Sequence, residues 1–277
     1  MPKHLTDDQI AAYQRDGYLF PVRVMAEAEA VECRHKLEAM EAKTGGALSG
    51  ALRFKPHLVL TWLDDLVRHP VILDAVEDII GPDIFCWATS FFTKEARDPA
   101  YISWHQDSTY WGLSEPDVVT AWVAFTPSTV EAGCMRVLPA SHTSDQIPHT
   151  DTQARENLLS RGQVVDVDVD EDKAVDVLLR PGEISLHHIR LIHGSEPNRS
   201  PDRRIGFAIR YIPPYVRQLK GAHDTAMLVR GEDPHHNFEH EPRPAADMHP
   251  DAQAFHAKSA EIHGQILYQG TERQPFS

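Results

Sequence analysis

Three His-X-Asp triplets carry the residue types of a mononuclear metal site. They are His105-Gln106-Asp107, His149-Thr150-Asp151 and His249-Pro250-Asp251. Two histidines and one carboxylate suit iron(II) with positions left open for substrate and oxygen. Residues two apart in a strand point to the same side, so one triplet can supply two ligands and a distal histidine the third. Because the chain has 17 histidines and 41 acidic residues, chance triplets are expected and context must choose among them.

The first triplet has the most strand-like surroundings. It stands between two aromatic and β-branched runs, residues 84–94 and 118–126, which are typical of strands. His149 lies in a polar stretch beside a proline, and the third triplet contains a proline and has no predicted sheet after it. We therefore predict that His105 and Asp107 are iron ligands, and that the other two triplets take no part in the reaction.

The third ligand is sought among three later histidines. His187 and His188 end a predicted strand, where a histidine hydrogen-bonded in the core is the ordinary alternative. His193 is followed by Gly194, which lets the backbone approach a ligand closely. An arginine eleven residues further on, Arg204, also favours His193 as the predicted third ligand.

Arg204 begins a predicted strand and has the chemistry to bind a dicarboxylate. A guanidinium group stays charged and can bind a carboxylate through two parallel hydrogen bonds, which lysine cannot do. Arg203 points to the other face of a regular strand, so we interpret it as a surface charge. Arg210 shares the parity of Arg204, and we interpret it as one partner of a structural salt bridge, with an inward-facing role as the alternative.

The predicted secondary structure that positions these residues is helical over about the first 80 residues and consists of strands in the segment that follows. Thr6 and Gln9 form a capping-box pattern that opens a short helix ending near Asp16-Gly17. Residues 26–43 are rich in helix formers, and residues 67–80 repeat apolar positions every four residues. The predicted strands are residues 84–94, 118–126, 164–170, 175–179, 183–188 and 204–212.

Short strands separated by turns favour a closed or sandwiched antiparallel sheet. After Pro213 we expect loops and a final helix near residues 251–267, packed on the outside. The predicted fold class is α+β, with a single domain over residues 1–277.

Composition narrows the functional classes. Apolar residues make up 42% and charged residues 25%, as in ordinary globular proteins, and the net charge of -14 disfavours nucleic acid and anionic membranes as partners. Three cysteines without a CxxC motif disfavour a disulfide framework. The N-terminus has no apolar signal core and no run approaches about 18 apolar residues. We predict a cytoplasmic protein; the sequence does not indicate its oligomeric state.

Several of these motifs, at their spacing, resemble the phytanoyl-CoA dioxygenase family over residues 5–215. They are Asp16-Gly17-Tyr18, Trp104-His105-Gln106-Asp107, Trp122, the run from Gly133 to His142, Pro181-Gly182-Glu183, His193-Gly194-Ser195 and Arg204. The resemblance implies a double-stranded β-helix (jelly-roll, cupin-like) barrel with packed N-terminal helices. It implies iron(II), 2-oxoglutarate and O2, with His105, Asp107 and His193 on iron. Arg204 and Ser195 then hold the distal carboxylate of 2-oxoglutarate.

The resemblance implies hydroxylation of an unactivated C–H bond, with release of succinate and CO2. The alternatives are chlorination or another oxidative outcome at the same iron, a non-catalytic binding module on the same barrel, and, less favoured, a zinc hydrolase. Chlorinating relatives replace the carboxylate ligand by a small residue, and Asp107 is intact. We expect a small, polar substrate. Tyr110, Trp111 and Trp62 are candidates to line its pocket and to hold a cationic group, with barrel packing as the alternative.

Overall fold

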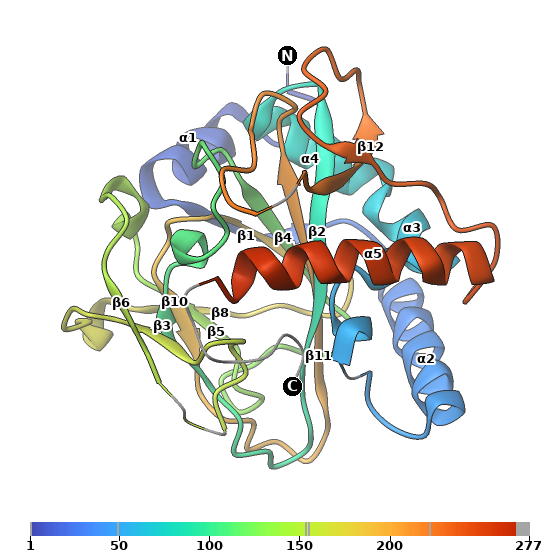
Figure 1. Ribbon diagram of the computed structural model, residues 1–277. Helices are drawn as coiled ribbons and strands as arrows, with labels where there is room; N and C mark the ends of the chain where they lie inside the picture. The colour runs from blue at the N-terminus through green and yellow to red at the C-terminus, as the bar shows by residue number, and fades with distance from the viewer. Residues whose placement is uncertain (1, 49, 153, 155, 222, 270–277) are drawn as a thin grey trace.

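The computed structural model describes residues 2–48, 50–152, 154, 156–221 and 223–269. Within this part of the chain a large sheet contains β1 (Tyr18–Arg23), β2 (Ile84–Lys94), β4 (Val119–Ala124), β9 (Glu183–His188), β11 (Arg204–Ile212), β12 (Thr225–Arg230) and β13 (Glu239–His240). Their order across the sheet is β1-β9-β4-β11-β2-β12-β13. The pairs are antiparallel except for β12 with β13 (Figure 1).

A smaller sheet contains β3 (Ile102–His105), β5 (Met135–Val137), β8 (Val175–Val177) and β10 (His193–Ser195), in the order β3-β10-β5-β8. A further pair joins β6 (His149–Asp151) to β7 (Gln163–Val165). One cavity is lined by residues of both the large and the smaller sheet. The two sheets therefore face each other across the cavity, as in a jelly roll.

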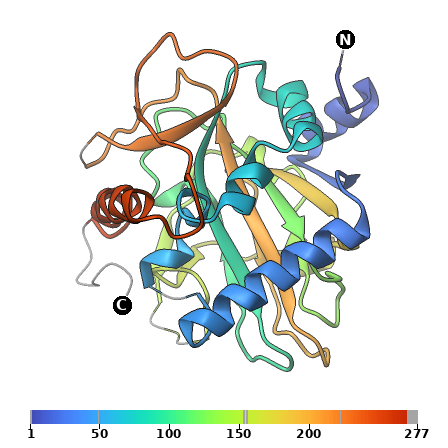
Figure 2. The same cartoon turned by 90° about the vertical axis from the view of Figure 1, so that its right-hand side faces the viewer.

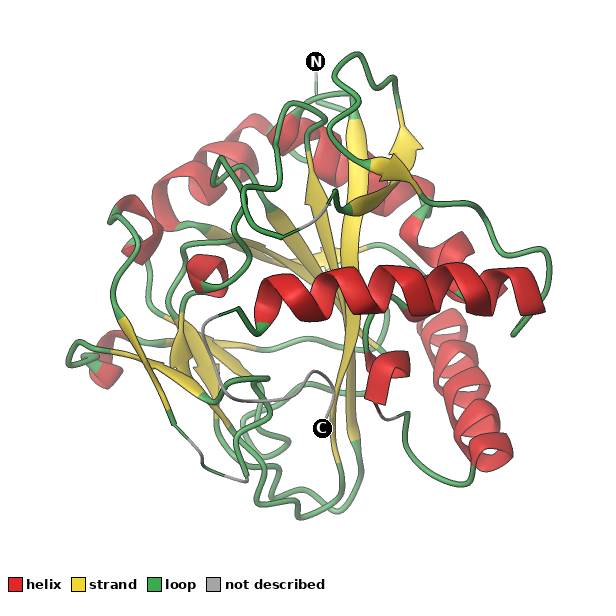
Figure 3. Ribbon diagram, viewed as in Figure 1, coloured by secondary structure: helices red, strands yellow, loops and turns green. Residues whose placement is uncertain are grey.

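Helices cover the outside of the strands (Figure 3). They are α1 (Asp7–Asp16), α2 (Glu27–Thr44), α3 (Thr61–Val67), α4 (Pro70–Ile80) and α5 (Pro250–Leu267). Short 3-10 turns span Gly50–Arg53, Pro56–Leu58, Asp107–Thr109, Ser141–Thr143 and Glu171–Lys173. Figure 2 shows α2 running across one face of the large sheet. On another side, Ala260 of α5 packs with Phe85 and Trp87 of β2.

The alternation of side chains along β11 explains how the sheet has a helical side and a cavity side. Ile205, Phe207 and Ile209 belong to one core cluster with residues of α2, α3 and α4. Arg204 and Arg210 have the opposite parity and line the cavity. Because strand side chains alternate between the two faces, one strand supplies both the main core and the wall of the cavity.

Most predicted elements are confirmed, and the α+β jelly-roll class with them. The capping box of Thr6 is present and Gly17 ends α1 in the left-handed conformation. The predicted strands at residues 84–94, 183–188 and 204–212 match β2, β9 and β11. The assignment of residues 1–277 to a single domain stays a prediction.

Four predictions about elements are wrong. The helix over residues 67–80 is two helices, because Pro70 starts α4 and disfavours a helical residue before it. The strand over 164–170 ends at Val165, and Val167 beyond it is 45% exposed. The first 80 residues also contain β1, and the segment after Pro213 contributes β12 to the large sheet.

Candidate metal centre

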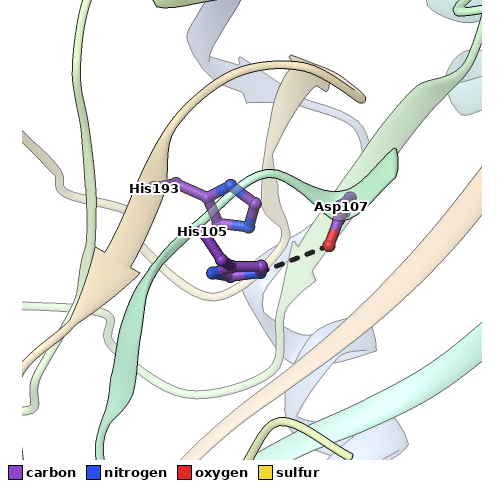
Figure 4. A group of neighbouring side chains, drawn as sticks. All are labelled: His105, Asp107 and His193. Carbon is purple, nitrogen blue, oxygen red and sulfur yellow. Dashed lines mark ion pairs between the residues drawn. The ribbon is translucent and has the colours of Figure 1, made fainter. Parts of the chain in front are cut away.

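The side chains of His105, Asp107 and His193 meet in the wall of the cavity. Their ligand atoms all lie within 4.8 Å of one another. His105 ends β3 and pairs with His193 of β10 in the antiparallel register, which brings the two rings to a centroid distance of 4.2 Å. Asp107 follows in the next turn, with its Oδ1 3.3 Å from Nε2 of His105 (Figure 4). Strand pairing thus joins the predicted triplet to the predicted distal histidine.

The backbone orients both imidazole rings. Nδ1 of His105 lies 2.9 Å from the carbonyl oxygen of Ser103, and Nδ1 of His193 lies 2.9 Å from that of Leu191. A carbonyl can only accept, so each Nδ1 carries the proton and each Nε2 presents a lone pair. Burial, followed by the charge of His105, lowers the pKa of His193 to about 4. Both observations keep the ring neutral, as a metal ligand requires.

Asp107 is held as a carboxylate. Burial alone would raise its pKa, but the neighbouring imidazoles of His105 and His193 and the guanidinium of Arg210 hold it well below the ordinary value. Only 11% of its side chain is exposed. The site therefore presents two neutral nitrogen donors and one anionic oxygen donor, the set that suits iron(II) with open positions.

The alternative distal histidines occupy different places. His187 lines the cavity, with its Nε2 4.0 Å from Oδ2 of Asp107 and no hydrogen-bond partner for Nδ1 among the described residues. Burial lowers its pKa to about 3. His188 points to the other face of β9, where its ring lies against His142 and its Nδ1 accepts the N–H of Arg190. The ordinary interpretation of His188 as a core histidine fits, whereas His187 belongs to the cavity wall.

The other two His-X-Asp triplets have structural explanations. His249 precedes α5, and its Nδ1 accepts the N–H of Asp251 at 3.3 Å. In the second triplet, Asp151 binds Arg161 and the hydroxyl of Tyr110. His149 lies beside the metal centre after all, because its Nε2 accepts the backbone N–H of Gln106 at 2.9 Å. It supports the segment between two candidate ligands, a position that the sequence does not indicate.

Arg204 and Ser195 line the same cavity as the three candidate ligands. Arg204 is 1% exposed, its Nη1 donates to the carbonyl oxygen of Gly133, and its Nε has no partner among the described residues. Lys94, which sequence reasoning missed, donates to Oγ of Ser195 at 2.7 Å. Burial, followed by the charge of Arg204, lowers the pKa of Lys94 to about 6. No ion pair joins Arg204 to a carboxylate within the described ranges, so this end of the cavity can accept an anion.

Two glycines allow close approaches around the cavity. A Cβ on Gly206 would lie 1.8 Å from the indole of Trp122, which itself stands 5.4 Å from the guanidinium of Arg204. A Cβ on Gly194 would lie 2.9 Å from the carbonyl oxygen of Ile102. Gly194 therefore permits the approach of β10 to β3, in addition to lining the cavity.

Arg203, just before β11, and Arg210 point to opposite faces of the strand, as strand parity predicts, but the interpretation of Arg210 is wrong. Arg203 faces away from the cavity and binds Glu41 and Glu95, each at 2.8 Å. Arg210 lines the cavity, and within the described residues no carboxylate forms an ion pair with it. The interpretation of Arg210 as a salt-bridge partner is therefore incorrect, because its side of β11 faces the cavity, where Asp107 acts on its charge without forming an ion pair with it.

The three aromatic residues predicted to line a substrate pocket lie in different surroundings. Trp62 packs with Phe91 and Phe125 on the helical side of the sheet, as barrel packing predicts. Tyr110 lies under the guanidinium of Arg161. Trp111 stands 5.3 Å from the guanidinium of Arg210, so its face already holds a cation from the chain itself. The face of Trp111 is therefore not free to bind a cationic group of a substrate.

Residues 13–206 match the family "Phytanoyl-CoA dioxygenase (PhyH)". The match covers most of the chain and includes the three candidate metal ligands, Ser195 and Arg204, so the chain belongs to this family. Its members are iron(II)- and 2-oxoglutarate-dependent dioxygenases that act on various substrates. The resemblance stated from the motifs alone is therefore confirmed.

Individual relatives agree with the family assignment. A probable alpha-ketoglutarate-dependent hypophosphite dioxygenase from Stutzerimonas stutzeri is 30% identical over 56% of this chain and 54% of the relative. The peroxisomal phytanoyl-CoA dioxygenase of Homo sapiens is 27% identical over 71% of this chain and 65% of the relative. The chain thus spans between about half and two thirds of the length of these curated relatives.

A solved structure extends the similarity to nearly the whole chain. The non-heme monooxygenase ThoJ, in its apo form, is 36% identical with a TM-score of 0.83, and the alignment covers 95% of this chain and 98% of ThoJ. The fold drawn in Figure 1 is therefore similar to that of ThoJ over 95% of the chain, which includes most of the region after the family match ends. Among the described residues, no helix is both long and apolar enough to cross a bilayer.

Proposed function

We propose that this protein is an iron(II)- and 2-oxoglutarate-dependent dioxygenase that hydroxylates an unactivated C–H bond of a small polar metabolite. In this proposal His105, Asp107 and His193 hold the iron, and Arg204 and Ser195 hold the distal carboxylate of 2-oxoglutarate. The observation that carries the proposal is the convergence of two neutral Nε2 atoms and one carboxylate within 4.8 Å, in a cavity where the buried Arg204 has no ion-pair partner among the described residues.

The residues fit both groups chemically. The two histidines present lone pairs toward one point because their Nδ1 protons are donated to backbone carbonyls. Arg204 is buried, positively charged and without an ion-pair partner among the described residues, and a carboxylate from outside the chain would complete it. Lys94 holds the hydroxyl of Ser195 at 2.7 Å and so fixes the second predicted contact.

The bound iron, with 2-oxoglutarate and O2, supplies the oxidising chemistry, and succinate and CO2 are the expected by-products. The chain contributes placement. Arg204 and Ser195 orient the co-substrate, Asp107 keeps one face of the metal anionic, and the apolar walls of Trp122, Met135 and Ala208 exclude water. No general base is required, and we assign none. Small molecules are the substrates of the relatives, which supports a small-molecule substrate here.

The test of this function is a metabolite screen that follows conversion of 2-oxoglutarate to succinate, preceded by an anaerobic titration of iron(II) and 2-oxoglutarate monitored by absorption. We expect an absorption band that needs both components and succinate formation that one class of metabolite stimulates. A protein that gives no band and no succinate would be a binding module on the same barrel. A site that binds zinc and hydrolyses a substrate without 2-oxoglutarate would also contradict the proposal.

Chlorination is the second outcome to test at this centre. Asp107 fills a position that chlorinating relatives leave to halide, so we expect hydroxylated product even at high chloride. Asp107→Ala vacates that position but also removes an anionic ligand. Since loss of outer-shell support alone costs about 10–100-fold in metal affinity, we expect a nearly inactive variant rather than a halogenase. Mass spectrometry of the products, with chloride present, checks both proteins; a chlorinated product from the wild type would exclude the hydroxylase assignment.

A further inference from the structure

Arg210 is a buried cation in the cavity that the proposed chemistry does not use. It is 7% exposed, its Nη1 donates to Oγ of Ser90, and its Nε has no partner among the described residues. The rings of Trp111 and Phe92 lie 5.3 and 5.7 Å from its guanidinium. An aromatic face stabilises a cation only modestly, whereas an unpaired buried charge is costly. Asp107 attracts this charge without forming an ion pair with it, so among the described residues no anion is in direct contact with the guanidinium of Arg210.

Arg210 and Arg204 stand at two ends of the cavity. They are six residues apart on the same face of β11, with the small residues Gly206 and Ala208 between them. At a rise of about 3.3 Å per residue, their backbone positions are roughly 20 Å apart. Across the large sheet, Arg210 pairs in register with Thr120 of β4, and Thr120 pairs with His187 of β9, whose Nε2 lies 4.0 Å from Oδ2 of Asp107. Arg204 pairs instead with Lys94 of β2, which donates to Ser195. Arg210 is therefore on the side of Asp107, and Arg204 lies toward the other end.

This division leaves Arg210 for a second anion. In the proposed function, 2-oxoglutarate places its distal carboxylate on Arg204 and its other end on the metal. It is too short to reach Arg210 as well. We propose, on the basis of the function proposed above, that Arg210 binds an anionic oxygen group of the primary substrate, a carboxylate or a phosphonate. Trp111 and Phe92 flank this subsite and keep the guanidinium turned into the cavity.

The charge of the whole protein makes the subsite selective. The formal net charge is -14, yet Arg204 and Arg210 both line the cavity without an ion-pair partner among the described residues. A local positive field inside an acidic protein favours small anions at this cavity. The substrate class that fits is a small organic acid, and its anionic group positions the C–H bond near the metal.

The test uses the full chain with iron(II) and 2-oxoglutarate under anaerobic conditions. The variants are Arg210→Gln and the charge-conserving Arg210→Lys, with Arg203→Gln as the matched control on the opposite face. The probes are straight-chain and aromatic monocarboxylates, each with its own primary amide, and alkyl phosphonates. Each probe is added to each protein and the shift in Tm is compared with the same protein without probe. Iron and 2-oxoglutarate affinities are measured separately by the absorption titration.

We expect at least one acid to raise the Tm of the wild type more than its amide does. Arg210→Gln should bind that acid at least tenfold more weakly and lose the preference over the amide, Arg210→Lys should keep part of it, and Arg203→Gln should keep all of it. Affinity for iron and 2-oxoglutarate should stay within about twofold of the wild type in every variant. If Arg210→Gln does not fold, the comparison of Arg210→Lys with the wild type decides.

Three results would overturn the proposal. A wild type that binds iron and 2-oxoglutarate but shows no preference for any anion would exclude the subsite alone. A tenfold loss of 2-oxoglutarate affinity in Arg210→Gln would assign Arg210 to the co-substrate, and a loss of iron affinity would assign it to orienting Asp107. A wild type that binds neither iron nor 2-oxoglutarate would instead contradict the proposed function itself.

Discussion

The two faces of β11 differ in function: one packs in the main core and the other lines the cavity. The face toward the helices carries Ile205, Phe207, Ile209 and Tyr211, which belong to the main core. The face toward the cavity carries Arg204, Gly206, Ala208 and Arg210. Both faces are buried, so burial alone does not distinguish them. The difference is that the apolar face is satisfied by its neighbours, whereas the two arginines have polar atoms that no described residue completes.

Buried polar atoms without hydrogen-bond or ionic partners are costly for folding. A strand face that carries such atoms therefore indicates a ligand site, where the ligand supplies the missing partners. Substitutions on the apolar face should therefore change stability and leave ligand binding intact. Substitutions on the cavity face should do the reverse. The predictions below test this division, beginning with the largest expected effect.

The candidate metal ligands should be indispensable for turnover. We expect His105→Ala, Asp107→Ala and His193→Ala each to abolish succinate formation while the far-ultraviolet circular dichroism stays that of the wild type. The physical reason is that each change removes one of only three protein donors. Iron content after anaerobic loading, together with activity, checks the outcome. Activity that persists in His193→Ala would transfer the role to His187, the other histidine of the cavity wall.

On the apolar face, Phe207→Ala should cost about 3–5 kcal/mol in the free energy of unfolding, the usual range for a buried phenylalanine. Its ring is fully buried and packs against Phe91 at a centroid distance of 4.8 Å. Urea unfolding of the metal-free protein measures the loss. Affinity of the folded protein for 2-oxoglutarate should stay unchanged, and a change of tenfold or more would show that the two faces are not independent.

On the cavity face, Arg204→Ala should weaken 2-oxoglutarate binding by about 2–5 kcal/mol, the range for removing one partner of a buried charge pair. Arg204→Lys should lose less, because a point charge replaces the two-pronged group. Arg203→Ala is the control: it removes ion pairs to Glu41 and Glu95 on the other face and should leave affinity for 2-oxoglutarate as it is. Equal effects of the two arginines would mean that parity does not separate their roles.

The sequence was sufficient to predict the pieces of this arrangement that depend on local pattern. The strand predicted over residues 204–212 matches β11 over its full length, and strand parity separated Arg204, which lines the cavity, from Arg203, which faces away. The sequence could not predict that Arg210 forms no ion pair with any described residue, because that depends on which acidic residues the fold brings near. The valine-aspartate alternation after Val164 failed for the same kind of reason. Alternation describes one strand, but a strand also needs a neighbour, and beyond Val165 none is present within the described residues.

His149 shows the same dependence on tertiary structure at the metal centre. From the sequence it competes with His105 as the start of a metal-binding triplet, and from the structure it supports that triplet. Its Nδ1 lies 2.8 Å from the carbonyl oxygen of Ile147, so the proton is there and Nε2 accepts the N–H of Gln106. Burial, the largest influence, lowers the pKa of His149 and keeps the ring neutral for this task.

The smallest predicted effect at the centre therefore belongs to His149→Ala. It leaves the N–H of Gln106 without its acceptor and loosens the segment between His105 and Asp107, so we expect iron affinity to fall about 10–100-fold, as for other outer-shell partners. His249→Ala is the matched control, because that histidine only caps α5; it should cost at most about 1 kcal/mol of stability and leave iron affinity unchanged. Competitive iron titration of both variants measures the difference. Restored affinity in His149→Gln, whose amide oxygen can accept the same N–H, would identify the hydrogen bond as the cause. Unchanged affinity in His149→Ala would show that strand pairing alone holds the two ligands in place.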